Sequence, residues 1–142
     1  MEKINFKNGQ APALNATNLN QLQTNIENAI NGVVESGSND DGSWIKYSDG
    51  TMFCYKTTGE IDMNITTPWG SLYEGNVSLG NLPAEFIETP KVFVTPFGSG
   101  MLIEQGGIYA SETSWGAATC VRPNSVENVK ARFYLMAIGK WK

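Results

Sequence analysis

The sequence contains no histidine, and this absence excludes several kinds of chemistry. Histidine is the commonest general base, the usual partner of a catalytic serine or cysteine, and the commonest zinc ligand. Two cysteines, Cys54 and Cys120, are too few for a structural zinc site, which needs four ligands. We therefore expect no catalytic triad, no metal site and no cofactor.

The N-terminus also lacks the apolar segment of a secretory signal peptide, since it reads MEKINFKNGQ. We expect a soluble product that is made in the cytoplasm. Proteins of reducing compartments rarely keep disulfides, so we favour free thiols over a bond between Cys54 and Cys120.

Charge and long apolar runs are scarce as well. Charged residues make up 17% of the chain, the net charge is -4, and the ten Lys and Arg residues are scattered. Nucleic-acid binding needs clustered basic residues that neutralise phosphates, so we expect no such partner. Every apolar run is far shorter than the roughly 18 residues of a membrane span, so we expect no membrane insertion. The 41% of hydrophobic residues is nonetheless enough for a globular core.

Residues 1–36 form the first predicted region, an extended segment followed by a helix. The stretch NATNLNQLQTNIENAINGVV has apolar residues three and four positions apart, which is the spacing of one helical face. These residues are Leu19, Leu22, Ile26, Ala29 and Val33. Asn15 or Thr17 would cap the start, and Gly32 or Gly37 would end the helix.

This helix is too weak to stand alone, because it has fewer than 20 residues and many of them are asparagine. Its apolar face either packs on the rest of the chain or joins copies of the chain in a short parallel bundle. We favour the bundle because the segment SGSNDDGS, which contains residues 37–43, reads as a flexible linker.

Residues 44–142 form the second predicted region, an antiparallel β-sandwich. Short β-branched or aromatic runs are separated by turn residues every eight to twelve positions. The strongest local signal is SWIKYSDGTMFCYK, in which Asp49-Gly50 predicts a hairpin with a primed turn. Pro96, inside KVFVTPF, predicts an edge strand or a bulge.

The aromatic residues provide the candidate binding site. A large amphipathic ring covers the apolar face of a sugar while nearby Asn, Ser and Thr side chains bind the hydroxyls. We expect most of the aromatic rings to be core, and those in loops beside Gly and Ser to be the candidates for ligand contact. The predicted carbohydrate-binding residues are Trp69, Tyr73, Tyr109 and Trp115.

Paired carboxylates are the remaining route to catalysis. Glu85 with Glu88, or Glu104 with Glu112, would perform glycoside hydrolysis if the two met in a cleft. We interpret these residues as solvated loop charges and predict no enzymatic activity.

Four segments, in order along the chain, suggest a family. INFKNGQAPALNATNLNQLQTNIENAI resembles the opening of many bacteriophage structural proteins. WIKYSDGTMFCYK resembles the hairpin that begins the terminal domain of phage tail-fibre and receptor-binding proteins, and LPAEFIETPKVFVTPF is similar to a segment of those domains and of H-type lectins. ARFYLMAIGKWK resembles their closing strand.

The resemblance implies a virion protein that forms a homotrimeric fibre. Its N-terminal region would attach to other virion proteins, and its C-terminal β-sandwich head would bind a host cell-surface carbohydrate. The alternative is a purely structural virion protein, such as a head or collar fibre, a decoration protein or another tail component. A glycan-cleaving enzyme is the third possibility.

Overall fold

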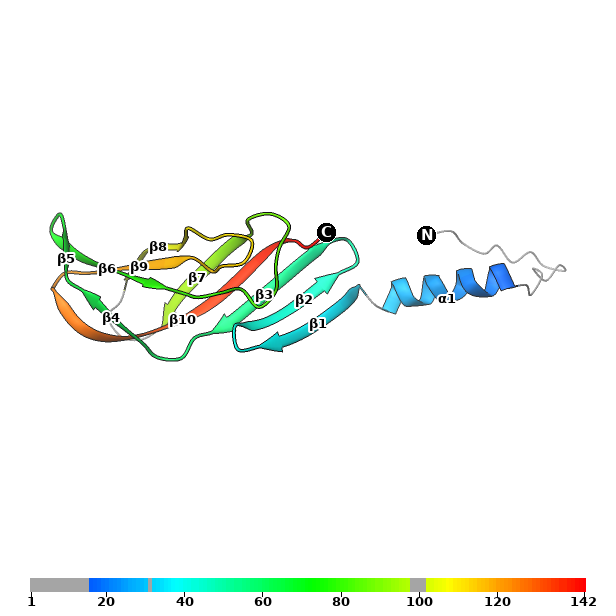
Figure 1. Cartoon of the computed structure of the whole chain (residues 1–142), viewed down its shortest axis with the longest axis horizontal. Coiled ribbons are helices and arrows are strands. Elements are labelled where there is room, and N and C mark those ends of the chain that lie inside the picture. The colour runs from blue at the N-terminus through cyan, green and yellow to red at the C-terminus, as the bar shows by residue number, and fades with distance from the viewer. Residues whose placement is uncertain (1–15, 31, 98–101) are drawn as a thin grey trace.

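The structure, a computed structural model, describes residues 16–30, 32–97 and 102–142 (Figure 1). The only helix in these ranges is α1, Ala16–Ile30, which lies beyond one end of a β domain and in line with its long axis. The predicted cap Asn15 lies outside the described residues. Helix α1 ends at Ile30, and Val33 is the first residue of strand β1. The assignment of Val33 to the helical face is therefore wrong.

The mainly β fold is confirmed. Ten strands follow α1 within the described ranges, and they form two antiparallel sheets. The strands are β1 Val33–Asn39, β2 Gly42–Tyr47, β3 Thr51–Thr57, β4 Ile61–Ile65, β5 Thr67–Trp69, β6 Leu72–Ser78, β7 Lys91–Phe97, β8 Leu102–Ile108, β9 Ala117–Arg122 and β10 Val126–Lys140.

The first sheet has the order β1-β2-β3-β10-β4, and β7 pairs with the other edge of β10. The second sheet has the order β5-β6-β9-β8. Strand β10 organises the first sheet, since its 15 residues pair with β3, β4 and β7. Pro96 lies in β7, which pairs only with β10, so the prediction of an edge strand is confirmed.

The core lies between the two sheets. Along β10, every second side chain is buried because successive residues of a strand point to opposite faces. Large buried side chains from both sheets and from the connecting loops form one cluster, which includes Met52, Ile65, Phe86, Trp115, Cys120 and Phe133.

The predicted hairpin between β2 and β3 is confirmed, but its turn differs from the predicted one. A primed turn needs positive φ at both central residues, whereas only Gly50, with φ 86°, has one in this loop. The Gly50 N–H donates to the Tyr47 carbonyl at 3.1 Å. This is the pattern of a type I turn followed by a glycine bulge, and the Thr51 N–H donates to the Asp49 side chain at 2.8 Å.

Residues 37–43, predicted as a linker, instead complete a hairpin. Strand β1 pairs with β2 from Val33 to Asn39, and the Asn39 side chain closes the turn by accepting the Asp41 N–H at 3.0 Å. Glu35 fixes β1 further, because it accepts hydrogen bonds from the Trp44 indole at 2.9 Å and from the Lys46 ammonium at 3.0 Å. Both bonds lower the pKa of Glu35 below its ordinary value. The β domain therefore begins at Val33.

Candidate functional site

The end of the β domain farthest from α1 is closed by the hairpin of β5 and β6. Trp69 pairs with Leu72 across a two-residue loop, in which Gly70 has φ 57° and Ser71 does not have a positive φ. Glycine at the first central position is the pattern of a type II′ turn. This tight loop holds the Trp69 indole, which is about half exposed, at the tip of the molecule.

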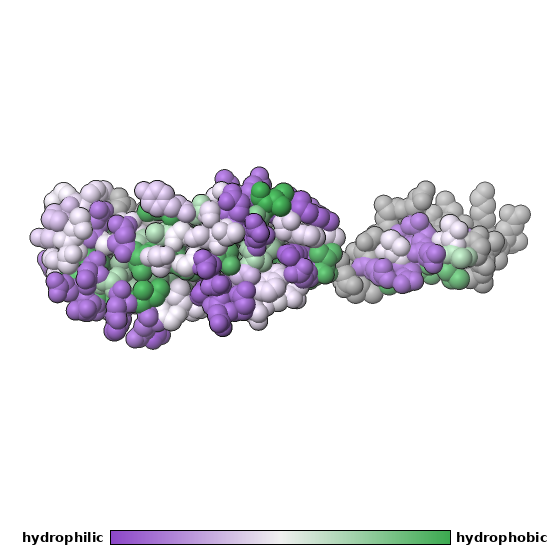
Figure 2. All heavy atoms as spheres, in the orientation of Figure 1, coloured by the Kyte–Doolittle hydropathy of each residue, from purple (hydrophilic) through white to green (hydrophobic). Residues whose placement is uncertain are grey.

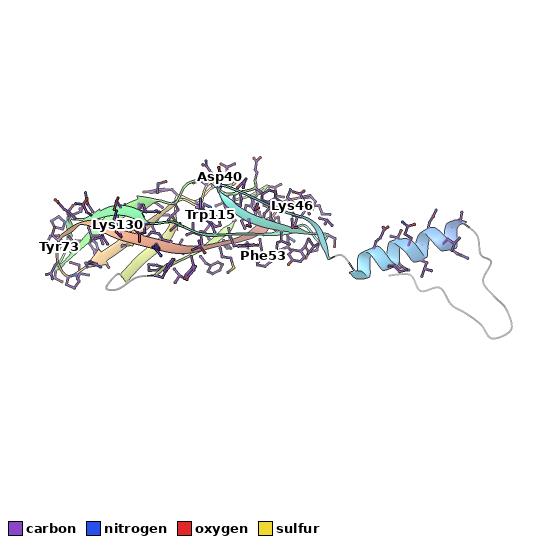
Figure 3. All side chains as sticks on the ribbon, turned by 90° about the horizontal axis from the view of Figure 1, so that it is seen from below. Asp40, Lys46, Phe53, Tyr73, Trp115 and Lys130 are labelled. Carbon is purple, nitrogen blue, oxygen red and sulfur yellow. The ribbon has the colours of Figure 1, made fainter. Side chains whose placement is uncertain are left out.

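Tyr73 lies at the same end but on the other face of the hairpin (Figure 3). It pairs with Pro68, whereas Trp69 pairs with Leu72, and adjacent pairs in a ladder point to opposite sides. Tyr73 is half-buried and packs against the core. The structure therefore brings Trp69 and Tyr73 to one end of the domain, but the two rings lie on opposite faces of the hairpin and do not contact the same sugar.

The other two predicted carbohydrate-binding residues lie elsewhere. Tyr109 is 90% exposed and follows β8, whose last residue is level with Ala117 and with the far end of β6. Tyr109 is therefore separated from Trp69 by the length of β6. This length is about 20 Å, at 3.4 Å per residue. Trp115 is fully buried, and its indole N–H donates to the Asp41 carbonyl at 3.4 Å. A ring with no exposed surface cannot stack on a sugar, so the prediction for Trp115 is corrected to a core residue.

Helix α1 has an uncovered apolar face. Leu19, Leu22 and Ile26 are each about half exposed, and α1 packs against no strand of the described chain. Figure 2 shows hydrophobic surface beside hydrophilic surface on this helix. Of the two arrangements that the sequence left open, packing of this face on the described strands is not observed, and the apolar face stays exposed.

A second uncovered apolar surface lies on the first sheet, on the side away from the core. Met136 of β10 is level with Tyr55 of β3 and with Phe93 of β7, so the three side chains lie on one face. They are 43%, 50% and 54% exposed. Tyr134, two residues from Met136, is 53% exposed and stacks on Phe97 with ring centroids 4.2 Å apart.

The next row along the sheet continues this surface. Phe53 is level with Ile45 and Ile138, all three are half-buried, and Phe53 lies edge-on to the Tyr47 ring. Figure 3 shows Phe53 at the margin of the domain, whereas Trp115 lies inside it. We call this surface the outer face, and it comprises Ile45, Phe53, Tyr55, Phe93, Phe97, Tyr134, Met136 and Ile138.

Charged residues border the outer face. Arg132 lies two residues before Tyr134 on the same side of β10 and forms an ion pair with Glu60 at 2.6 Å. Lys130 follows in the same row and pairs with Asp62, which raises the pKa of Lys130. At the opposite end, Lys91 is level with Ile138. The outer face is therefore an apolar centre with a charged border.

The sequence contained a signal for the outer face. In ARFYLMAIGK both alternating sets are apolar: Phe133, Leu135 and Ala137 are buried, whereas Tyr134, Met136 and Ile138 lie on the outer face. A strand that is apolar on both sides is typical of a sheet covered on both sides. Within the described part of one chain, only one side of this sheet is covered.

The residues considered for chemistry lie in unreactive surroundings. Cys54 and Cys120 are free and fully buried, which confirms the prediction of free thiols. Burial raises the pKa of each thiol to about 11 and so suppresses the reactive thiolate. Within the described ranges, no cluster of three or more potential metal ligands occurs.

The glutamates that the sequence offered as catalytic pairs lie at exposed positions or in hydrogen bonds to other residues, where their side chains are described. Glu85 and Glu88 are both exposed, and Glu112 accepts a hydrogen bond from the Thr89 hydroxyl at 3.1 Å. The side chain of Glu104 lies outside the described residues.

No helix in the described part of the chain is long and apolar enough to cross a membrane.

Comparisons with known proteins give one structural likeness. No protein-family profile matches the chain, and no curated protein sequence matches it. The solved structure of an N-truncated R1-type pyocin tail fibre is 18% identical with a TM-score of 0.47, and the match covers 82% of this chain and 94% of that one. These values are too low to carry an argument about function.

Proposed function

We propose that this chain is a bacteriophage virion fibre that binds a host cell-surface carbohydrate without catalysis. The observation that carries the proposal is the arrangement of the chain along one axis. An amphipathic helix with an uncovered face lies at one end, and an exposed tryptophan on a tight hairpin lies at the other (Figure 1). The four sequence segments that resemble tail-fibre proteins support the same arrangement.

In the proposed assembly, three copies join through Leu19, Leu22 and Ile26 of α1. Ala29 belongs to the same predicted face, although its side chain lies outside the described residues. The region before α1 attaches to other virion proteins. Because the three tips point in the same direction, weak carbohydrate sites act together, which raises avidity by a factor of roughly 10² to 10⁴.

Trp69 is the residue that we assign to carbohydrate contact at the tip. Tyr73 and Tyr109 lie too far from its face to share one sugar, so Tyr109 would serve a separate site. An exposed indole provides the apolar platform, and neighbouring hydroxyl and amide groups supply the hydrogen bonds.

Binding of the full chain to a printed array of bacterial surface polysaccharides tests the proposal. We expect Trp69→Ala to abolish the binding and Ile87→Ala to leave it unchanged, because Ile87 is a more exposed apolar residue than Trp69, at 62% against 46%, and its N–H donates to the carbonyl of Lys140, close to the C-terminus. Binding that is no stronger than that of an unrelated β-sandwich protein would contradict the proposal.

A purely structural virion protein is the second candidate. It is favoured by one observation: the predicted carbohydrate residues are dispersed, whereas the apolar outer face is continuous. Virions that lack the protein would adsorb normally to their host in this case, and they would adsorb poorly if the first proposal holds.

A further inference from the structure

We propose that the outer face is an interface between copies of this chain. The proposal deepens the homotrimer of the proposed function, on which it rests, by naming the surface of the β domain that joins the copies. Each outer face binds the corresponding region of the other copies.

The size of the outer face supports this assignment. A large aromatic side chain has about 150 to 250 Å² of surface, so Tyr55, Phe93, Tyr134 and Met136 together leave roughly 400 Å² uncovered. The four half-buried neighbours bring the total to roughly 600 Å², which is at the upper limit for the largest apolar patch of a monomer. A standard interface takes about 800 Å² from each partner, and α1 adds further area.

The composition also fits contact between identical partners. Tyr, Phe and Met are enriched at the centre of interfaces, whereas charged residues are depleted there and occur at the rim. The outer face has no acidic residue at its centre, and the ion pairs of Glu60 with Arg132 and Asp62 with Lys130 lie at its border. Two copies therefore meet without burying like charges, although the chain carries a net charge of -4.

A carbohydrate would need more varied polar neighbours. Sugar hydroxyls are bound by several kinds of polar group placed among the aromatic rings, namely amides and carboxylates as well as the hydroxyls of Ser and Thr. Between the rings of the outer face, the strands place Ser43, Thr57 and Thr95, which are level with Tyr55 or Tyr134, and no amide or carboxylate side chain. Apolar contact with another protein surface fits this composition better.

The direction of α1 completes the argument. The helix continues the long axis of the β domain, and its uncovered face is the second apolar surface of the same chain (Figure 1). In the proposed assembly the copies are related by an axis parallel to this direction, and each copy contributes both surfaces to the contact. Neither surface then remains exposed to water.

The test uses the full chain with Met136→Glu, which places a carboxylate at the centre of the outer face. Glutamate at this half-exposed site leaves the core of the monomer intact, so its circular dichroism spectrum, which reports the fold and not the assembly, should match that of the parent chain. In the assembly the carboxylate is buried without a partner. We expect the concentration at which half of the chains are assembled to rise at least about thirtyfold in sedimentation equilibrium.

Two further variants complete the design. Ile87→Glu makes the same change at a position that is 62% exposed and outside the outer face, and it should leave the association unchanged. Tyr55→Lys places a positive charge next to Met136, and it should weaken association as Met136→Glu does. Equal effects of a positive and a negative charge show that burial of the charge, and not its sign, weakens the association.

Three results would overturn the proposal. The first is that Met136→Glu and Tyr55→Lys associate like the parent chain. The second is that the parent chain is a monomer. The third is that Met136→Glu loses polysaccharide binding while its mass stays unchanged, which would make the outer face a ligand surface. If the outer face fails but Trp69→Ala still abolishes array binding, the proposed function stands without this interface.

Discussion

Removal of α1 is expected to weaken association while leaving the β domain folded. The structure sets the position of the cut: a chain that begins at Gly32 keeps all of β1, whereas one that begins at Ser38 loses five of its seven residues. The second chain also loses Glu35 and its hydrogen bonds to Trp44 and Lys46. The two shortened chains therefore separate assembly from stability.

The magnitudes follow from the exposed area and the lost bonds. Full burial of a Leu or Ile side chain is worth about 1.5 to 3 kcal/mol, so the half-exposed Leu19, Leu22 and Ile26 contribute roughly 2 to 4 kcal/mol per chain to association. This corresponds to a roughly 30- to 1,000-fold weaker assembly for the chain that begins at Gly32. The Ser38 chain loses the pairing of five β1 residues with β2 as well as the Glu35 hydrogen bonds, so its melting temperature should be lower than that of the Gly32 chain.

Sedimentation velocity over a concentration series measures the assembly, and circular dichroism measures the melting temperature. At a concentration at which both are dissociated, the Gly32 chain should melt like the full chain, and its assembly should dissociate at a much higher concentration. Unchanged assembly of the Gly32 chain would refute the role of α1. A Ser38 chain as stable as the Gly32 chain would refute the role of β1 in the domain.

The remaining predictions concern the core. Gly75→Ala should lower stability by about 1 to 3 kcal/mol in denaturant unfolding, because a Cβ would collide with the Asn64 carbonyl, whereas Gly59→Ala meets no neighbour and should be neutral or stabilising; equal effects would contradict this packing. Cys54 and Cys120 should react with a thiol reagent only in denaturant, and rapid labelling of the native chain would exclude their burial. Burial raises the pKa of both thiols from 9.0 to about 11, so the folded state holds their protons more tightly than the unfolded state does. The free energy of unfolding should therefore be constant up to about pH 9 as far as these thiols are concerned, and it should fall as the pH rises toward 11. A free energy of unfolding that does not change between about pH 9 and 11 would contradict the shift.

Much of the fold follows from the sequence because its strands have local signals. Short aromatic and β-branched runs bounded by turn residues predicted β2, β3 and β7 close to their observed positions. Strand β1 was missed because VVESGSN has the composition of a loop. It is held by pairing with β2 and by the contacts of Glu35, which are tertiary interactions with no local signature.

The candidate site was less predictable, because exposure depends on the packing of distant segments. Trp69 and Trp115 each precede a glycine in the sequence, yet one lies at the tip and the other in the core. Trp115 is buried because its loop crosses the β1–β2 turn, where the indole reaches Asp41. The outer face, by contrast, was readable in the doubly apolar pattern of β10.

The most direct test of the account is the mass of the unmodified full chain in solution, measured by native mass spectrometry at micromolar concentration. We expect an assembly with three times the 15.5 kDa mass of one chain. Three copies would place the exposed faces of α1 and of the first sheet against one another and leave three tips free. A single chain at every concentration would contradict the fibre assembly and the interface proposed for the outer face.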